Sequence, residues 1–182
     1  MQFKVTTVEH HCWPSPRQVE QALGSFDLTI ENIKATLEMF QQSFDDHQSG
    51  GFQKYLADAL EAYLKAMITQ RKGLRSANTR YSPRLNEKAD LAFGREYDGS
   101  RAFVEIEFRP NVEKDLIKFQ IGANCNTLAI GILVLAMSRN DINPGYTTMP
   151  EYEKFLRVIE ELGPNYPVLL LGFRGEGTGV AT

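Results

Sequence analysis

Residues 88–108 read Lys-Ala-Asp-Leu-Ala-Phe-Gly-Arg-Glu-Tyr-Asp-Gly-Ser-Arg-Ala-Phe-Val-Glu-Ile-Glu-Phe, and this stretch decides the expected fold. Two segments of alternating polarity flank the turn-rich residues 95–100, a pattern typical of a β-hairpin with a long loop. Side chains two apart on a strand share a face. The second strand therefore presents two faces, an apolar one formed by Val104, Ile106 and Phe108 and another formed by Phe103, Glu105 and Glu107.

The register of this hairpin determines which acidic side chains meet. If Leu91 pairs with Val104, both enter the core and Asp90 stands directly across from Glu105. The carboxylates of Asp90, Glu105 and Glu107 then share one face. Facing like charges destabilise a strand pair and raise the pKa of at least one group. A divalent cation would remove this conflict, and oxygen ligands of this kind suit Mg²⁺.

Two alternatives to this metal site follow from the same residues. The acidic face is, in the first, simply a solvated strand surface. In the second, a different hairpin register makes Glu96 or Asp98 the partner of Glu105 in place of Asp90.

The rest of the chain predicts helices on either side of a mixed sheet. Helical spacing spans residues 17–44, with a break near 24–27, and an apolar stripe follows over 52–67. Further helices are expected at 111–122 and 150–162, and strands at 3–8, 128–136 and 168–173. The last two strands are apolar throughout, which is typical of parallel strands covered on both faces. The order β-α-α-β-β-α-β-α-β predicts a three-layer α/β domain.

Composition bounds the size and class of the protein. The chain has 182 residues, 42% hydrophobic and 24% charged, which suits one soluble domain with a sizeable core and excludes a disordered chain. The formal net charge of −3 argues against a nucleic-acid coat protein. One stretch is nevertheless basic, with a single acid, Glu87, among seven basic residues: Lys65, Arg71, Lys72, Arg75, Arg80, Arg84 and Lys88. This stretch predicts that a polyanion binds to one face of the protein; the alternative is that the stretch is a solvated loop.

Cysteine usage and hydropathy place the chain in a reducing, aqueous compartment. Two cysteines, Cys12 and Cys125, cannot form a disulfide framework, so we expect a cytoplasmic protein. The N-terminal residues follow a strand pattern without a signal peptide, and the longest apolar run, 127–137, is too short to span a membrane. Adjacent strand residues point to opposite faces, so His10, His11 and Cys12 are not expected to bind a metal together.

Four segments of the sequence, taken in order, resemble a known family. They are Met-Gln-Phe-Lys-Val-Thr-Thr-Val-Glu-His-His from residue 1, Phe-Val-Glu-Ile-Glu-Phe from 103, Lys-Asp-Leu-Ile-Lys-Phe from 114, and Pro-Val-Leu-Leu-Leu-Gly from 167. Together they resemble the type II restriction endonucleases of the BamHI, BglII and BstYI group, in the PD-(D/E)xK nuclease superfamily, over nearly the whole chain.

The resemblance implies a three-layer restriction-endonuclease-like fold with a central mixed β-sheet flanked by helices. We expect one endonuclease-like domain over residues 1–182. Its parts are an N-terminal strand and helices (1–87), a metal-site hairpin and core (88–138), and a C-terminal helix and strand (150–174).

The resemblance also assigns roles to the acidic residues. Asp90 takes the metal-binding aspartate position, Glu105 the glutamate position, and Glu107 the position usually held by lysine, a replacement found within the group. Asp90 and Glu105 would hold Mg²⁺, and Glu107 would be a further ligand or the base. Ala89 stands where the family has proline. Glu61 is a candidate fourth acid from the preceding helix, its alternative being a solvated helix position.

The basic residues become candidate phosphate contacts in this interpretation. Lys114 and Lys118, on the helix after the hairpin, are candidates to face the same cleft, although Asp115 and Lys118 are also spaced for a surface ion pair. We predict a Mg²⁺-dependent, sequence-specific type II endonuclease that cuts double-stranded DNA as a homodimer, without a membrane partner. The alternatives are a catalytically degraded DNA-binding or defence-associated protein that retains the nuclease fold, and a purely structural interaction module.

Overall fold

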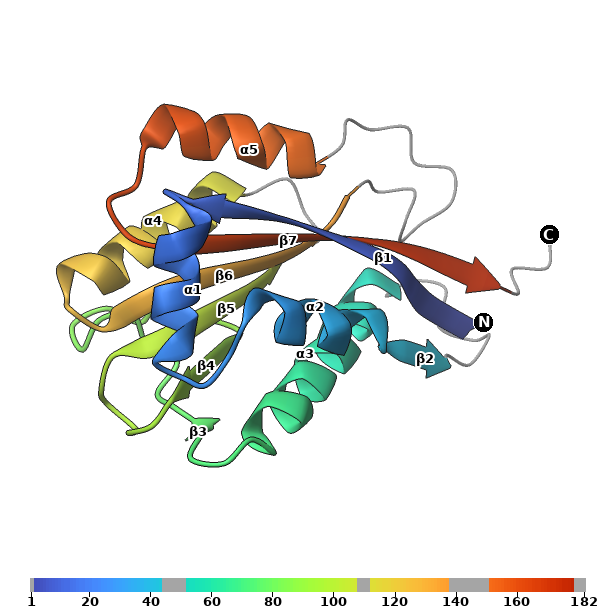
Figure 1. Ribbon diagram of the computed structural model, residues 1–182, viewed down its shortest axis with the longest axis horizontal. Coiled ribbons are helices and arrows are strands. Elements are labelled where there is room, and N and C mark those ends of the chain that lie inside the picture. Colours follow the sequence, from blue (N-terminus) through green and yellow to red (C-terminus); the bar gives the residue numbers. More distant parts are fainter. Residues whose placement is uncertain (1, 44–51, 108–111, 138–150, 179–182) are drawn as a thin grey trace.

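A computed structural model describes residues 2–43, 52–107, 112–137 and 151–178, which form one seven-stranded sheet and five helices (Figure 1). The strands are β1 (Gln2–Trp13), β2 (Gln41–Ser43), β3 (Arg75–Ser76), β4 (Leu91–Gly94), β5 (Arg101–Glu107), β6 (Leu128–Ala136) and β7 (Val168–Thr178). The helices are α1 (Pro16–Gly24), α2 (Ile30–Glu38), α3 (Phe52–Thr69), α4 (Val112–Asn124) and α5 (Glu151–Leu162).

The sheet is mixed, as predicted, with strand order β2-β1-β7-β6-β5-β4-β3. Strands β5, β6 and β7 are parallel, and the remaining neighbours pair antiparallel. The apolar run of β6 lies at the middle of the sheet, and its residues from Ile130 to Ala136 are buried. Successive side chains of β6 enter two different core clusters, which confirms that this strand is covered on both faces.

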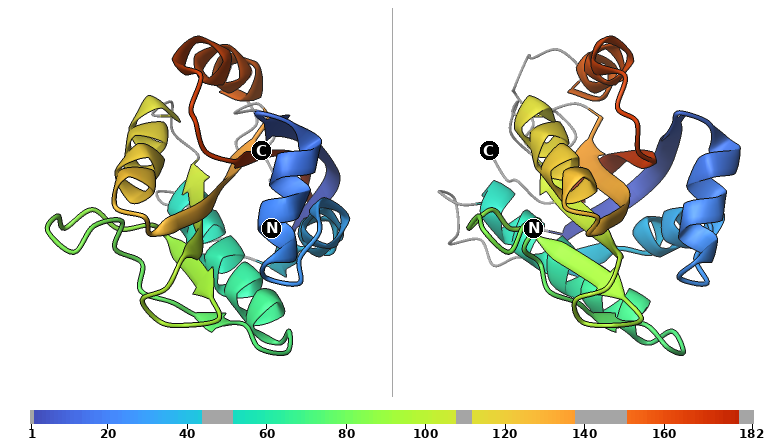
Figure 2. Two further views of the ribbon diagram at one scale, coloured as in Figure 1. Left: turned by 60° about the vertical axis from the view of Figure 1, so that its left-hand side comes forward. Right: turned by 90° about the vertical axis from the view of Figure 1, so that its left-hand side faces the viewer.

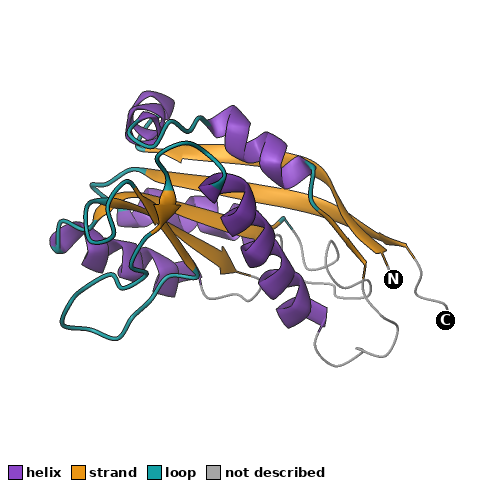
Figure 3. Cartoon of the chain, turned by 90° about the horizontal axis from the view of Figure 1, so that it is seen from below, coloured by secondary structure: helices purple, strands orange, loops and turns teal. Residues whose placement is uncertain are grey.

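Helices cover the two faces of the sheet unequally (Figures 2 and 3). Helices α1, α2 and α3 pack on one face, where α3 buries the stripe Leu56, Leu60, Leu64 and Ile68. Helices α4 and α5 pack on the other face through side chains such as Phe119 and Phe155. Each stripe repeats every three or four residues, so it faces the sheet along the helix. The predicted three-layer arrangement is confirmed.

The N-terminal helical pattern is divided by capping residues. The Ser15 hydroxyl accepts a hydrogen bond from the Gln18 N–H at the start of α1, and the Thr29 hydroxyl accepts one from the Asn32 N–H at the start of α2. Between the helices, Asp27 adopts a positive φ of 55°, so the predicted break near 24–27 is confirmed. The helix predicted to continue toward residue 44 instead ends at Glu38, because residues 41–43 pair with β1 as the edge strand β2.

The hairpin of β4 and β5 has the predicted register. Leu91 pairs with Val104, and both are buried in the core beneath α3. Phe103 and Glu105 lie two positions apart on β5 and therefore share the opposite face, where both are buried toward α4. Phe108, predicted to continue the apolar face of β5, lies outside the described residues. Besides β2, the sequence analysis did not predict β3, which pairs Arg75 with Gly94 and lies within the basic stretch.

Candidate active site

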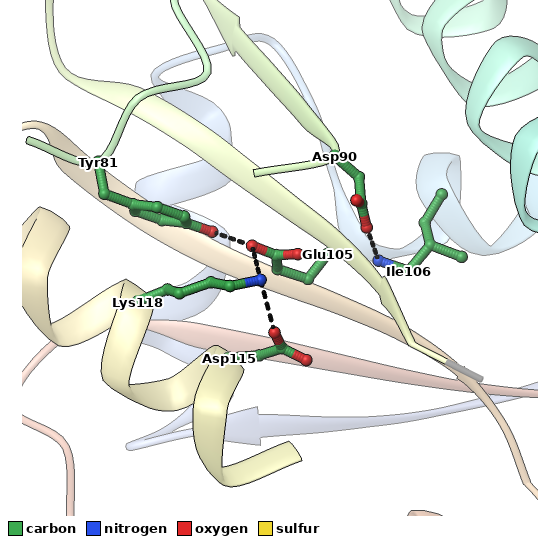
Figure 4. Close-up of polar contacts among 6 residues, drawn as sticks. All are labelled: Tyr81, Asp90, Glu105, Ile106, Asp115 and Lys118. Carbon is green, nitrogen blue, oxygen red and sulfur yellow. Dashed lines mark hydrogen bonds and ion pairs between the residues drawn. The ribbon is translucent and has the colours of Figure 1, made fainter. Parts of the chain in front are cut away.

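Glu105 is the centre of the candidate site. It sits near the end of β5, on the face toward α4, and is only 3% exposed. Its Oε1 atom accepts a hydrogen bond from the Tyr81 hydroxyl at 2.7 Å and lies 3.0 Å from Nζ of Lys118 (Figure 4). Strand β5, helix α4 and the loop before β4 thus meet at a single carboxylate oxygen. Burying a charge is unfavourable unless it is paired, and these two donors supply that pairing.

Lys118 also joins Glu105 to a second buried acid. Its Nζ atom lies 3.0 Å from Oδ1 of Asp115, one turn earlier on α4. The side chains of Asp115 and Lys118 are 2% and 13% exposed, so the pair that the spacing allowed on the helix surface is formed in the interior instead. The other Asp115 oxygen, Oδ2, is buried and has no hydrogen-bond partner within the described structure. One ammonium group therefore serves two buried carboxylates, and one of their oxygens is unsatisfied.

Asp90 approaches the site from the neighbouring strand. It immediately precedes Leu91, the first paired residue of β4, so continuing the register places it opposite Glu105. Its Oδ2 atom accepts a hydrogen bond from the backbone N–H of Ile106 at 2.7 Å, which ties the two strands at this end (Figure 4). Asp90 is exposed, whereas Glu105 is buried, so the two carboxylates form the outer and inner parts of one acidic site.

The electrostatics of the site reflect burial and crowding of acids. Burial, then Asp115, raise the pKa of Glu105 to about 8, with a further contribution from Asp90, and Lys118 and Tyr81 only partly oppose this. The pKa of Asp115 is also raised, mainly by burial. Burial alone would lower the pKa of Lys118, but Glu105 and Asp115 outweigh it and raise that pKa. Burial and Glu105 keep the pKa of Tyr81 well above its ordinary value, so its hydroxyl is a donor.

Two further predicted acids lie at the edges of this site. Burial raises the pKa of Glu61 on α3, and the charge of Asp90 is the next largest cause. Glu61 is half-buried, so it is not the fully solvated helix position of the alternative. Glu107, at the end of β5, is half-buried. The alternative partners are elsewhere: Asp98 accepts a hydrogen bond from the Asn78 amide at 3.0 Å, and the observed register leaves Asp90 as the residue opposite Glu105.

The donor set suits a divalent cation, although it is not assembled around one. Within the described ranges, no group of three or more His, Cys, Asp or Glu side chains is placed so that it could hold a metal ion. The three carboxylates predicted to converge are therefore not gathered into such a group. Carboxylate oxygens are nevertheless the ligands that Mg²⁺ prefers. Asp90 and Glu105 supply such oxygens from adjacent strands, and the buried Oδ2 of Asp115 has no hydrogen-bond partner in the described part of the chain. The residues present thus fit a cation.

The basic stretch is distributed over several elements. Lys65 lies on α3, Arg71 and Lys72 follow that helix, Arg75 is in β3, and Arg80, Arg84 and Lys88 belong to the loop before β4. Six of the seven are exposed, as is Lys114 on α4. The exception is Arg71, whose guanidinium donates to Asn32 Oδ1 at 3.2 Å and to the Asp27 carbonyl at 3.4 Å. Arg71 fastens α3 to α2, so its main contacts are internal.

Tyr81 fixes the basic loop to the candidate site. Arg80 and Lys88 form an isolated β-bridge, and the Tyr81 N–H donates to the Glu87 carbonyl at 3.2 Å. Residues 80–88 therefore form a loop whose two ends are paired with each other. At its base the Tyr81 ring is fully buried against Phe103, with ring centroids 4.4 Å apart. Sequence reasoning missed Tyr81, because an aromatic residue inside a basic loop carries no periodic signal.

His10, His11 and Cys12 occupy consecutive positions of β1, where they are exposed, half-buried and buried in that order. Among the residues that the structure describes, none of the helices combines the length and apolar character that crossing a membrane requires.

The model of the family described as "Restriction endonuclease BglII/BglIII" matches residues 8–173, which include every candidate site residue named above. No curated protein is significantly similar to the chain.

Proposed function

The chain belongs to the BglII/BglIII restriction endonuclease family and is thus a type II site-specific deoxyribonuclease acting on double-stranded DNA, and we propose that it cleaves this DNA with Mg²⁺ held by Asp90 and Glu105. We further propose that residues 1–182 work as one endonuclease domain and that two copies act together. Cutting both strands of a palindromic site matches the two-fold symmetry of a homodimer.

The observation that carries this proposal is the register of the β4–β5 hairpin, which places the carboxylates of Asp90 and Glu105 opposite each other. Burial and Asp115 raise the pKa of the Glu105 carboxyl group to about 8, and a cation bound beside it would favour the ionised form. Asp90 lies across the strand pair and offers a second carboxylate. When bound here, a divalent cation supplies Lewis acidity toward a phosphate oxygen and lowers the pKa of a water molecule.

The residues of the chain divide the remaining work. Asp90 and Glu105 bind and orient the cation, and Lys118 limits the repulsion between Glu105 and Asp115 at 3.0 Å from each. Glu107, half-buried at the end of β5, accepts the proton of the attacking water or adds a ligand. Glu61, on α3, has its pKa raised by burial and by the charge of Asp90, and is the candidate fourth acid.

The DNA backbone would lie along the exposed basic residues of the stretch 65–88 and along Lys114. These are Lys65, Lys72, Arg75, Arg80, Arg84, Lys88 and Lys114, each able to contact a phosphate. Arg71 was grouped with them on the sequence, but its guanidinium is engaged with Asn32 and Asp27. We therefore propose that Arg71 supports the surface and the other residues contact DNA.

Plasmid DNA incubated with the purified chain and MgCl₂ tests the activity, with EDTA as the metal-free control. We expect discrete fragments with Mg²⁺ and none with EDTA. Asp90→Asn and Glu105→Gln should each lower cleavage by at least about a hundredfold, because each removes a proposed ligand charge. Lys154→Met, at an exposed ion pair on α5, is the control. Cleavage that persists in EDTA, or that survives both substitutions, would contradict the assignment of the metal site.

The second candidate is a family member that binds DNA without cutting it. One observation favours it: Lys118 already pairs with the two buried carboxylates, at 3.0 Å from each. If this second candidate is right, the chain binds DNA in EDTA with an affinity that depends strongly on salt, and adding Mg²⁺ produces no fragments. Fragments with Mg²⁺ would dismiss it.

A further inference from the structure

Two donors from different elements hold one oxygen of Glu105. The Tyr81 hydroxyl donates to Oε1 at 2.7 Å, and Nζ of Lys118 lies 3.0 Å from the same atom. In Figure 4 the other carboxylate oxygen points away from both donors, toward the side on which Asp90 is drawn. A carboxylate held in this way has its rotation fixed, with one oxygen engaged inside the protein and the other presented to the acidic site.

Tyr81 is itself firmly held. Its side chain is 0% exposed, and its carbonyl accepts a hydrogen bond from the Thr127 hydroxyl at 2.7 Å. Its ring packs against Phe103 and Phe119, with centroid distances of 4.4 and 6.1 Å. The loop backbone, β5 and α4 therefore all determine where the Tyr81 oxygen lies, and the hydroxyl has little freedom to follow a moving carboxylate.

We propose that Tyr81 is a positioning residue of the metal site, which fixes the rotation of the Glu105 carboxylate so that its free oxygen faces the cation. This inference rests on the proposed function. Tyr81 suits the role better than Lys118, because a neutral hydroxyl orients the carboxylate without repelling a cation. Hydrogen-bond partners of metal ligands are commonly worth ten- to hundredfold in metal affinity.

A positioning role has a signature that loss of stability lacks. Mg²⁺ demands near-ideal octahedral geometry, whereas Ca²⁺ accepts flexible coordination. Freeing the Glu105 carboxylate should therefore weaken Mg²⁺ binding more than Ca²⁺ binding. Tyr166 provides a matched control, because it is also buried, at 6% exposure, and its hydroxyl donates to the Leu116 carbonyl of α4 at 2.9 Å.

The experiment titrates the full-length wild type, Tyr81→Phe and Tyr166→Phe with MgCl₂ and with CaCl₂ in an isothermal calorimeter, without DNA. For Tyr81→Phe we expect Mg²⁺ affinity to fall at least about tenfold and Ca²⁺ affinity less than about threefold. Tyr166→Phe should bind both ions as the wild type does. If Tyr81→Phe does not fold, Thr127→Val, which releases the Tyr81 carbonyl, takes its place with the same expected selective loss.

Three results would overturn the inference. Unchanged Mg²⁺ affinity in Tyr81→Phe refutes the positioning role alone, because the wild type still binds the metal. Equal losses for both ions, or the same losses in Tyr166→Phe, show that Tyr81 contributes only to folding. A wild type that binds neither ion refutes the metal assignment of the proposed function, and the inference fails with it.

Discussion

Replacing Lys118 with Met should destabilise the metal-free protein more than any exposed ion pair could. The substitution keeps the apolar stem and removes the ammonium, leaving Glu105 and Asp115, which are 4% and 2% exposed at their side chains, without a cation. Breaking a buried pair on one side costs about 3–5 kcal/mol. For a chain of 182 residues the entropy of unfolding is about 0.4 kcal/mol/K, so Tm should fall by roughly 10 °C.

Thermal unfolding in EDTA at pH 8, followed by circular dichroism, measures this loss. Lys154→Met is the matched control, because Lys154 pairs with Glu113 at 3.1 Å between α5 and α4, but both side chains are at least 40% exposed. It should shift Tm by less than about 3 °C. Adding Asp115→Asn to Lys118→Met should recover part of the loss, since it removes one of the two stranded charges. If Lys118→Met melts within 3 °C of the wild type, as the control should, the assignment of Lys118 as a buried counter-ion is wrong.

Three other predictions concern pH, packing and DNA. The folded pKa of Glu105, about 8, lies above its ordinary value of 4.5, so the stability it contributes is complete below about pH 4.5 and is lost as the pH rises through 8. Urea unfolding in EDTA should show a decline on the order of 4 kcal/mol over that window, and in Glu105→Gln the decline should be largely absent. Gly131→Ala should cost about 1–3 kcal/mol in the same assay, because the new Cβ would meet the Phe119 ring at 2.5 Å, whereas Gly24→Ala, with nothing within 4 Å, should be neutral or stabilising. Arg84→Ala should weaken DNA binding in EDTA and reduce the salt slope by about one, while Arg71→Ala should lower Tm and leave that slope unchanged; the opposite pattern in filter-binding titrations would show that Arg71 is the phosphate contact.

The parts of the fold that follow from periodicity were predictable. Alternation over β4 and β5 predicted which side chains share a face, and the observed pairing of Leu91 with Val104 is the register on which the predicted acidic site depended. Alternation alone left open another register, with Glu96 or Asp98 opposite Glu105. The continuous apolar run of β6 likewise required cover on both faces. Strands β2 and β3 were not predictable, since they span three and two residues and their burial patterns show no alternation. Their pairing depends on the neighbouring strand edge.

The acids of the candidate site were easier to find than their partners. The hairpin pattern makes Glu105 and Asp90 candidates, because one register places these residues of adjacent strands together. Tyr81 and Lys118 reach Glu105 only after a loop and a helix have packed on β5, and nothing local specifies that packing. The same limit applies to Arg71: its charge is visible in the sequence, but the contact with Asn32, 39 positions away, is not.

The loop of residues 80–88, whose two ends are paired with each other, determines how the chain would respond to a protease. Its outer part carries an exposed Arg84 followed by the exposed Leu85, a bond that trypsin can reach. Both ends are fastened: Tyr81 by its contacts with Glu105 and Thr127, and Ala89 by the hydrogen bond from its N–H to the Thr79 carbonyl at 2.9 Å. A single nick after Arg84 would therefore leave two fragments, each with strands of the same sheet, that stay associated until the protein is denatured. We therefore expect that the backbone can be cut in this loop, by a protease or by circular permutation, while the contacts of the candidate site at Glu105 are retained.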